Sequence, residues 1–263
     1  MVRWIAVSGL VMGSLGLGAQ GTVAGKAEPF EVATIKLVDP GERAGRFIRM
    51  EGDHRFIGKN YTLKLLIAAA YELNPKTISG GPGWVTEDHY DVVAVTPGEK
   101  KPSRDQQMAM LRLLISERFA LKFHREQKEF SIYELSRAKG GSKLKASTQA
   151  PDEAPQTIST VYPQKIKMPA RNVSMGDFAS VLQRAILDRP VVDKTGLTGR
   201  YDFDLEWAPD ETQLSGDIPA APADSPSPPL FTAVQEQLGL KLEETKGMVN
   251  ALVIDGAHRP LEN

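Results

Sequence analysis

The residues that offer acid–base chemistry most directly are His89 and its neighbours Asp88 and Asp91. An imidazole beside a carboxylate is the arrangement that a general acid–base pair requires. All three, however, lie at or just before the start of an expected strand, residues 90–95, and residues two apart in a strand share a face by geometry alone. A catalytic pair and an ordinary strand face are both open interpretations. We predict the strand face, with no catalytic residue.

A row of carboxylates, Asp202, Asp204 and Glu206, alternates along a second expected strand. Carboxylate oxygens bind hard cations, so this row is a candidate cation site. Strand alternation alone would also place all three on one wet face, and we predict that arrangement. The histidines form no HExxH motif and no pair at helical spacing, so we expect no zinc site; they are His54, His89, His124 and His258.

A glycine-rich segment, Gly80 to Gly83, has the sequence Gly-Gly-Pro-Gly. Glycine-rich loops can cradle phosphates through backbone N–H groups, but a phosphate loop continues with Lys and Ser or Thr. This one does not, and Pro82 lacks the N–H that a cradle would use. We therefore expect a structural turn and no bound cofactor. No serine lies in a GxSxG motif.

Two tryptophans, Trp84 and Trp207, are candidates either for the core or for exposed recognition surfaces. Aromatic side chains bury a large apolar area, and we expect both in the core.

The composition excludes several classes of protein. The chain of 263 residues has no cysteine, which excludes disulfides, thiolate catalysis and cysteine-bound zinc. Its formal net charge of −1 gives no global attraction to nucleic acid or to an anionic membrane, so no nucleic-acid partner is expected. The hydrophobic share of 41% is typical of a globular protein, and the length is enough for one large or two small domains.

Residues 1–27 have the features of a signal peptide. Arg3 precedes an uncharged, mostly apolar run, and small residues follow at Ala19, Ala24 and Ala27. A membrane anchor that stays attached is the alternative, but the run is shorter than the roughly 20 apolar residues of a spanning helix. We expect cleavage, export to the periplasm or beyond, and no stable membrane span afterwards.

Hydrophobic period and turn residues predict the elements of the first half. Strands are expected at 30–37, 46–50, 55–58 and 90–95, the last buried on both faces. Helices are expected from Thr62 to about Leu73 and from Ser103, where Gln106 could complete a capping box. Residues 121–124 and 130–135 are expected to form a hairpin, and residues 139–157 a linker.

The second half is expected to follow the same order. One or two strands at 158–168 precede a helix that begins at Ser174, with Phe178, Val181, Leu182, Ala185 and Ile186 facing inward. A strand follows at 201–207, then a helix that Gly239 ends. Residues 240–243 and 249–254 would form a closing hairpin.

The two halves resemble each other in sequence. Thr62 aligns with Ser174, and Tyr90-Asp91 with Tyr201-Asp202, one residue out of step. Residues 119–123, Phe-Ala-Leu-Lys-Phe, match residues 238–242, Leu-Gly-Leu-Lys-Leu. An internal duplication would explain this pattern. The alternative is that two segments of mixed helix and strand look alike by chance.

Several segments resemble an uncharacterised family of secreted proteins of soil bacteria. They are residues 30–36, 80–84, 90–92, 111–122, 191–202 and 253–263. The family's domain is also found fused to membrane metallopeptidases of the antibiotic-sensor type, which implies a role in envelope sensing. It defines no catalytic residues. A weaker similarity, over residues 172–187 and 230–254, is to the short N-terminal domain of secretins and TonB-dependent receptors.

These observations predict an α+β protein with two similar halves, each a small, mostly antiparallel sheet with two helices. The expected organisation is a signal peptide at 1–27, a first repeat at 28–138, a linker at 139–157 and a second repeat at 158–263. The expected function is that of an exported, non-enzymatic module that binds an envelope protein or a peptide, with a sheet edge as the candidate surface. A hydrolase of envelope or extracellular polymers and a small-ligand sensor are the alternatives.

Overall fold

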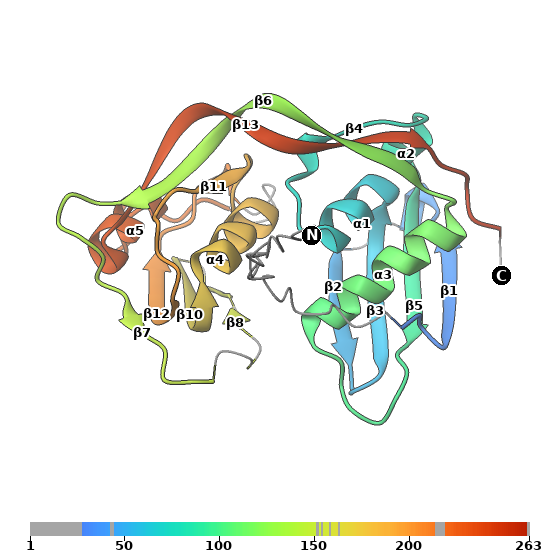
Figure 1. Cartoon of the computed structure of the whole chain (residues 1–263), viewed down its shortest axis with the longest axis horizontal. Coiled ribbons are helices and arrows are strands. Elements are labelled where there is room, and N and C mark those ends of the chain that lie inside the picture. The colour runs from blue at the N-terminus through green and yellow to red at the C-terminus, as the bar shows by residue number, and fades with distance from the viewer. Residues whose placement is uncertain are drawn as a thin grey trace, which may run out of the picture.

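A computed structural model describes residues 28–42, 45–150, 153, 155–157, 159–162, 164–213 and 219–261. The predicted signal peptide lies outside these described residues. The described chain combines helices with mostly antiparallel sheets, so the predicted mixture of α and β structure is confirmed. Two parts lie side by side, and a long pair of strands arches over both (Figure 1).

The first part is built on an antiparallel sheet in the order β1-β5-β3-β2. Its strands are β1 (Val32–Leu37), β2 (Phe47–Glu51), β3 (Arg55–Thr62) and β5 (His89–Val95). Helices α1 (Leu63–Ala70) and α3 (Arg104–Arg118) pack on it and share its core. The prediction that strand 90–95 is buried on both faces is wrong. Alternate residues of β5 are buried, and the others are half-buried or exposed.

Helices α1 and α3 begin as predicted. Thr62 caps α1 by accepting a hydrogen bond from the N–H of Leu65, and Ser103 forms a capping box with Gln106 at the start of α3. Helix α1 ends at Ala70, earlier than predicted, because Glu72 has a positive φ of 55°, which an α-helix cannot contain.

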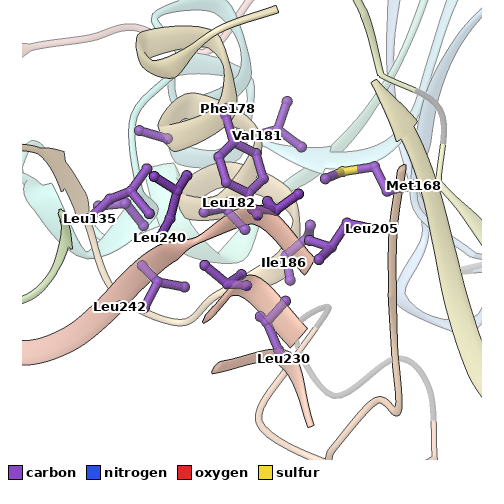
Figure 2. Close-up of a cluster of buried hydrophobic side chains, with 14 of the residues drawn as sticks. Leu135, Met168, Phe178, Val181, Leu182, Ile186, Leu205, Leu230, Leu240 and Leu242 are labelled. Carbon is purple, nitrogen blue, oxygen red and sulfur yellow. The ribbon is translucent and has the colours of Figure 1, made fainter. Parts of the chain in front are cut away.

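The second part has a sheet in the order β7-β12-β10-β8, with β9 also paired to β10. Its longer strands are β10 (Lys165–Ser174) and β12 (Arg200–Trp207), and β9 spans Thr160–Tyr162. The segment predicted as a linker contributes the short strands β7 (Lys145–Ala146) and β8 (Gln156–Thr157). Helices α4 (Met175–Val181) and α5 (Leu230–Leu238) complete this part. Their apolar side chains meet those of the sheet in one cluster (Figure 2).

Helix α4 begins with the capping box of Ser174 and Asp177 and continues into a π-helix, η3 (Leu182–Ile186). The N–H of Leu187 donates to the carbonyl of Leu182, 2.7 Å away and five residues back. The wider turn changes which side chains face inward. Leu182 and Ile186 are buried as predicted, but Ala185 is exposed, so its predicted inward position is wrong.

Both predicted hairpins are wrong. Residues 121–135 belong to one long strand, β6 (Lys122–Arg137), and residues 240–254 to another, β13 (Leu240–Gly256). The two pair antiparallel with each other from end to end and form the arch in Figure 1, which we call the ribbon. The polar stretches that resemble turns, 127–129 and 243–246, are exposed along the ribbon.

Each end of the ribbon gains a parallel strand and enters a core. Strand β4 (Ile78–Gly80) pairs with β13, and β11 (Val191–Asp193) pairs with β6. Leu252 and Ile254 of β13 lie in the core of the first part. Reciprocally, Tyr133 and Leu135 of β6 lie in the core of the second (Figure 2 labels Leu135). Each core therefore includes a strand from the other half of the chain.

The glycine-rich segment forms a tight turn after β4. Gly80 and Gly81 have φ values of 79° and 76°, which favour glycine. A Cβ on Gly80 would lie 2.6 Å from the carbonyl oxygen of Ile254, so the turn requires glycine to approach β13. A short helix, α2 (Trp84–Glu87), follows.

No helix within the described ranges is both long enough and apolar enough to span a membrane.

Candidate functional site

The structure gives His89 and its acidic neighbours hydrogen-bond partners other than one another. Its Nδ1 lies 3.2 Å from the carbonyl oxygen of Asn60. Asp88 instead accepts a hydrogen bond of 2.7 Å from Arg259. Asp91 pairs with Lys59 and accepts from the N–H of Asn60. Each carboxylate is thus engaged by a donor other than the imidazole.

The acidic row on β12 is held by donors from the neighbouring strand β10. Asp202 accepts from the N–H of Asn172 at 2.8 Å, and Asp204 pairs with Arg171 at 2.9 Å. Glu206 accepts from Lys165 and Lys167, and these bonds, with one from Ser227, lower the pKa of its carboxyl to about 2 although burial opposes the shift. Among the residues that the structure describes, no cluster of three or more His, Asp or Glu side chains could hold a metal ion.

The two tryptophans differ in how deeply they are buried. Trp207 is fully buried, as predicted, and its indole N–H donates to Gln213 at 2.8 Å. Trp84 is half-buried at the edge of the first core, where it stacks on Phe119 and Arg259 lies over its ring.

A cavity with a volume of about 680 Å³ lies between the two parts. We call it the cleft. One wall is formed by α1 and the segment that follows it, which includes the 3-10 helix η2 (Pro75–Thr77); the other is formed by η3 and the residues after it. Its apolar lining comes from both walls: Ile48, Leu65, Ala68, Ala69, Leu73, Pro75, Ala185, Ile186 and Leu187.

Polar residues of the cleft tie the two walls together. Asn74 Nδ2 donates to the carbonyl oxygen of Gln183 at 2.8 Å, and Gln183 Nε2 donates back to the carbonyl of Glu72 at 2.9 Å. Lys76 forms an ion pair of 2.9 Å with Asp188. These bonds join segments more than 100 residues apart in sequence, so they fix the distance between the walls.

Positively charged side chains outnumber negatively charged ones in the lining of the cleft. Four cationic side chains line it, Arg46, Lys76, Arg104 and Arg184, against the single carboxylate of Asp188. Burial opposes ionisation of Asp188, but hydrogen bonds from Lys76 and Tyr133 outweigh it and lower the pKa of that carboxyl. Burial and the nearby Asp188 together raise the pKa of Tyr133 to about 12. Asp188 therefore stays ionised, and the cleft still carries an excess of positive charge.

Sequence patterns do not indicate this cleft. Its lining comes from positions 46 to 188, and the residues meet only because the ribbon and the cross-wall bonds bring the two parts together. One local signal was available: Arg184 stands among apolar residues of an amphipathic helix, between Leu182 and Ile186. Ala185 and Arg184 face the cleft because of the π-helix, and the hydrophobic period of the sequence does not predict a π-helix.

Comparison with curated proteins gave no match, and comparison with solved structures gave none either. One family model, described as a protein of unknown function (DUF3738), matches residues 64–257. The match includes all but the first residue of α1, together with η3 and both strands of the ribbon, and it covers well over half of the chain. The chain therefore belongs to this family of proteins of unknown function.

Proposed function

We propose that the protein is an exported, non-enzymatic module that binds a peptide segment in the cleft between its two parts. The observation that carries the proposal is the cavity of about 680 Å³, whose apolar lining comes from both walls. Ligand sites have volumes of about 300 to 1,000 Å³ and combine an apolar lining with a few polar groups. The cleft has both properties.

The lining favours binding over hydrolysis. Among the described residues that line the cleft there is no Ser, Cys or His side chain to act as a nucleophile with an adjacent base. Its one carboxylate, Asp188, is engaged by Lys76 and Tyr133.

A sheet edge remains a second possible surface for a peptide. The edge strand β1 exposes Val32 and Leu37. A strand added there would gain backbone hydrogen bonds, whereas side-chain pockets supply specificity in such complexes. The cleft offers the larger apolar volume, so we assign the peptide to it.

Panning of the purified protein against phage-displayed random peptides would test the cleft. We expect selected peptides to lose affinity at least tenfold on Ala185→Trp, because the new indole would fill the cavity from an exposed position. The matched control is Ala146→Trp, on the exposed strand β7 outside the cleft. Selected peptides that bind both variants equally well would overturn the proposal, as would a failure to select any. Selected peptides that lose affinity for the variant Val32→Lys, which changes the edge strand β1, would favour the edge instead.

Export is the second element of the proposal, supported by the sequence of residues 1–27. Mass spectrometry of protein recovered from a bacterial host should show an N-terminus between Gly18 and Glu28. Intact Met1 in the membrane fraction would contradict cleavage.

We propose, thirdly, that the two halves arose by duplication. Supporting features come in pairs: a capping Thr62 and Ser174, an Asn60 and Asn172 with φ values of 58° and 55°, and an aspartate that accepts from each Asn N–H. The flanking parallel strands also match, since β4 pairs with β13 as β11 pairs with β6. Superposition of the two halves in a crystal structure would test it, and different strand orders would argue against it.

A further inference from the structure

The guanidinium of Arg184 is poorly neutralised. Its side chain is about 20% exposed, and its Nε is buried without a hydrogen-bond acceptor among the described residues. The nearest carboxylate oxygen, Oε1 of Glu72, is 4.0 Å from Nε, beyond hydrogen-bond length. Burial, and secondly the charge of Arg104, lower the pKa of Arg184 to about 10, so the group is still charged at neutral pH.

A second guanidinium competes for the same carboxylate. Arg104, at the first position of α3, has its Nε 3.9 Å from the same Oε1 of Glu72. Two cations therefore share one oxygen, and neither is within hydrogen-bond distance of it. A buried charge is stable only when hydrogen bonds and an opposite charge compensate it. The two guanidinium groups are therefore incompletely neutralised, and a second anion could bind to them.

A small cavity beside the cleft provides room for such an anion. It has a volume of about 110 Å³, and Arg104 and Arg184 line both it and the cleft. Ser180, one turn before Arg184, also lines it, and its Oγ is buried without a hydrogen-bond partner in the described structure.

Three carboxylates also face this small cavity. Glu72 is shared between the two arginines, Asp177 belongs to the capping box of α4 and lies 3.4 Å from Arg200, and Asp105 is exposed in the first turn of α3. None of the three accepts a hydrogen bond from Arg184 in the described structure.

We infer that Arg184, Arg104 and Ser180 form a subsite for a carboxylate of the ligand, so that the bound peptide is acidic. This inference rests on the proposed function, because the apolar side chains of the same peptide would occupy the cleft. A guanidinium holds a carboxylate through two parallel N–H···O bonds, and the hydroxyl of Ser180 would donate a third. The exposed part of Glu72 would turn toward solvent.

Two related dyes provide defined probes for the subsite. 8-Anilinonaphthalene-1-sulfonate carries one anionic group, and N-phenyl-1-naphthylamine is its uncharged parent. Fluorescence titration gives the Kd of each. We expect Arg184→Met to weaken binding of the sulfonate about tenfold, as for a charge-assisted hydrogen bond, and to change binding of the parent less than twofold. Arg104→Met should have the same effect, and the control Arg137→Met, an exposed arginine at the end of β6, should have none.

Each outcome decides between the proposals. If Ala185→Trp blocks both dyes but the arginine variants affect neither, the carboxylate subsite is wrong and the cleft stands. If Ala185→Trp blocks neither dye, the cleft and the subsite both fall. Selected peptides supply the second readout: changing Asp or Glu to its amide should weaken binding to the wild-type protein but not to Arg184→Met. Should Arg184→Met fail to fold, as judged by its melting curve, Arg104→Met carries the test, because Arg104 is about 43% exposed.

Discussion

Charged side chains of the second sheet are arranged across neighbouring strands. Glu206 on β12 lies 3.0 Å from Lys165 and 3.2 Å from Lys167 on β10, and Ser227 donates a further bond. These donors stabilise the ionised carboxylate in the folded protein, whereas the unfolded chain has no such arrangement.

Glu206→Gln should therefore reduce stability in a pH-dependent way. The folded pKa of about 2 lies below the ordinary value of 4.5, so the carboxylate stabilises the fold above pH 4.5 and loses its contribution as the pH falls toward 2. The side chain is partly exposed, so the difference at pH 7 should be about 1 kcal/mol at most. Urea unfolding of both proteins at pH 7 and at pH 3 would measure it. An equal difference at both pH values would contradict this account.

Asp202 and Asp204, two residues apart, should respond very differently to removal. Asp202 accepts from the N–H of Asn172, a fully buried residue, and Asp202→Ala leaves that donor without its acceptor, at a cost of about 1 to 3 kcal/mol. Asp204 is about 73% exposed and only pairs with Arg171, so Asp204→Ala should have little effect. Thermal unfolding of the two variants distinguishes them, and equal losses would show that the Asn172 contact is unimportant.

Residue-level prediction from sequence succeeded where the cause is local. The capping box of Ser103 and Gln106 and the burial of Trp207 follow from neighbouring residues and strand alternation. It failed for Ala185, because a π-helix changes the facing of side chains without changing their apolar pattern. Arg184, next to Ala185, is a candidate ligand contact only because Arg104, far away in sequence, lies beside it.

Element boundaries depend on particular backbone conformations, and the junction of α5 and β13 is the clearest case. Gly239 has a φ of 65°, and a Cβ there would lie 2.1 Å from the carbonyl oxygen of Gly141. Gly196 has the same φ but no atom within 4 Å of an added Cβ.

Gly239→Ala should consequently destabilise the protein more than Gly196→Ala. Gly196→Ala should cost only the free energy of placing an alanine in the left-handed conformation, about 1 kcal/mol. Gly239→Ala has the same cost and also places its Cβ against the backbone of Gly141, so β13 or the 138–143 loop must shift. Differential scanning calorimetry should show the larger drop in Tm for Gly239→Ala. Equal drops would mean that the loop moves away freely.

Strand pairing was the part of the fold that local patterns could not supply. Sequence patterns correctly predict strands near 121–135 and 240–254. They wrongly predict that each segment turns back on itself as a hairpin at its polar middle. The true partner of β6 is more than 100 residues away, and nothing in either segment identifies it. The cleft was missed for the same reason, since it exists only once the two parts are joined.

At the scale of the whole molecule, the ribbon should hold the halves together even when the chain is cut. Thr148 is exposed between β7 and β8, so a protease site inserted there can be cleaved without breaking a core. The fragments should stay associated in gel filtration because β6 and β13 pair along their whole length and each fragment supplies core residues to the other. Separation of the fragments without denaturant would contradict this.

The exchange of core strands also has a consequence for the order in which the protein is made. Synthesis begins at the N-terminus, and domains generally fold as soon as their residues are available. The core around Ile35 and Phe56 cannot be completed at that stage, because Leu252 and Ile254 leave the ribosome only after the residues of the second part. The first part of the nascent chain therefore remains open until β13 has been synthesised, so the two parts are completed together and not one after the other.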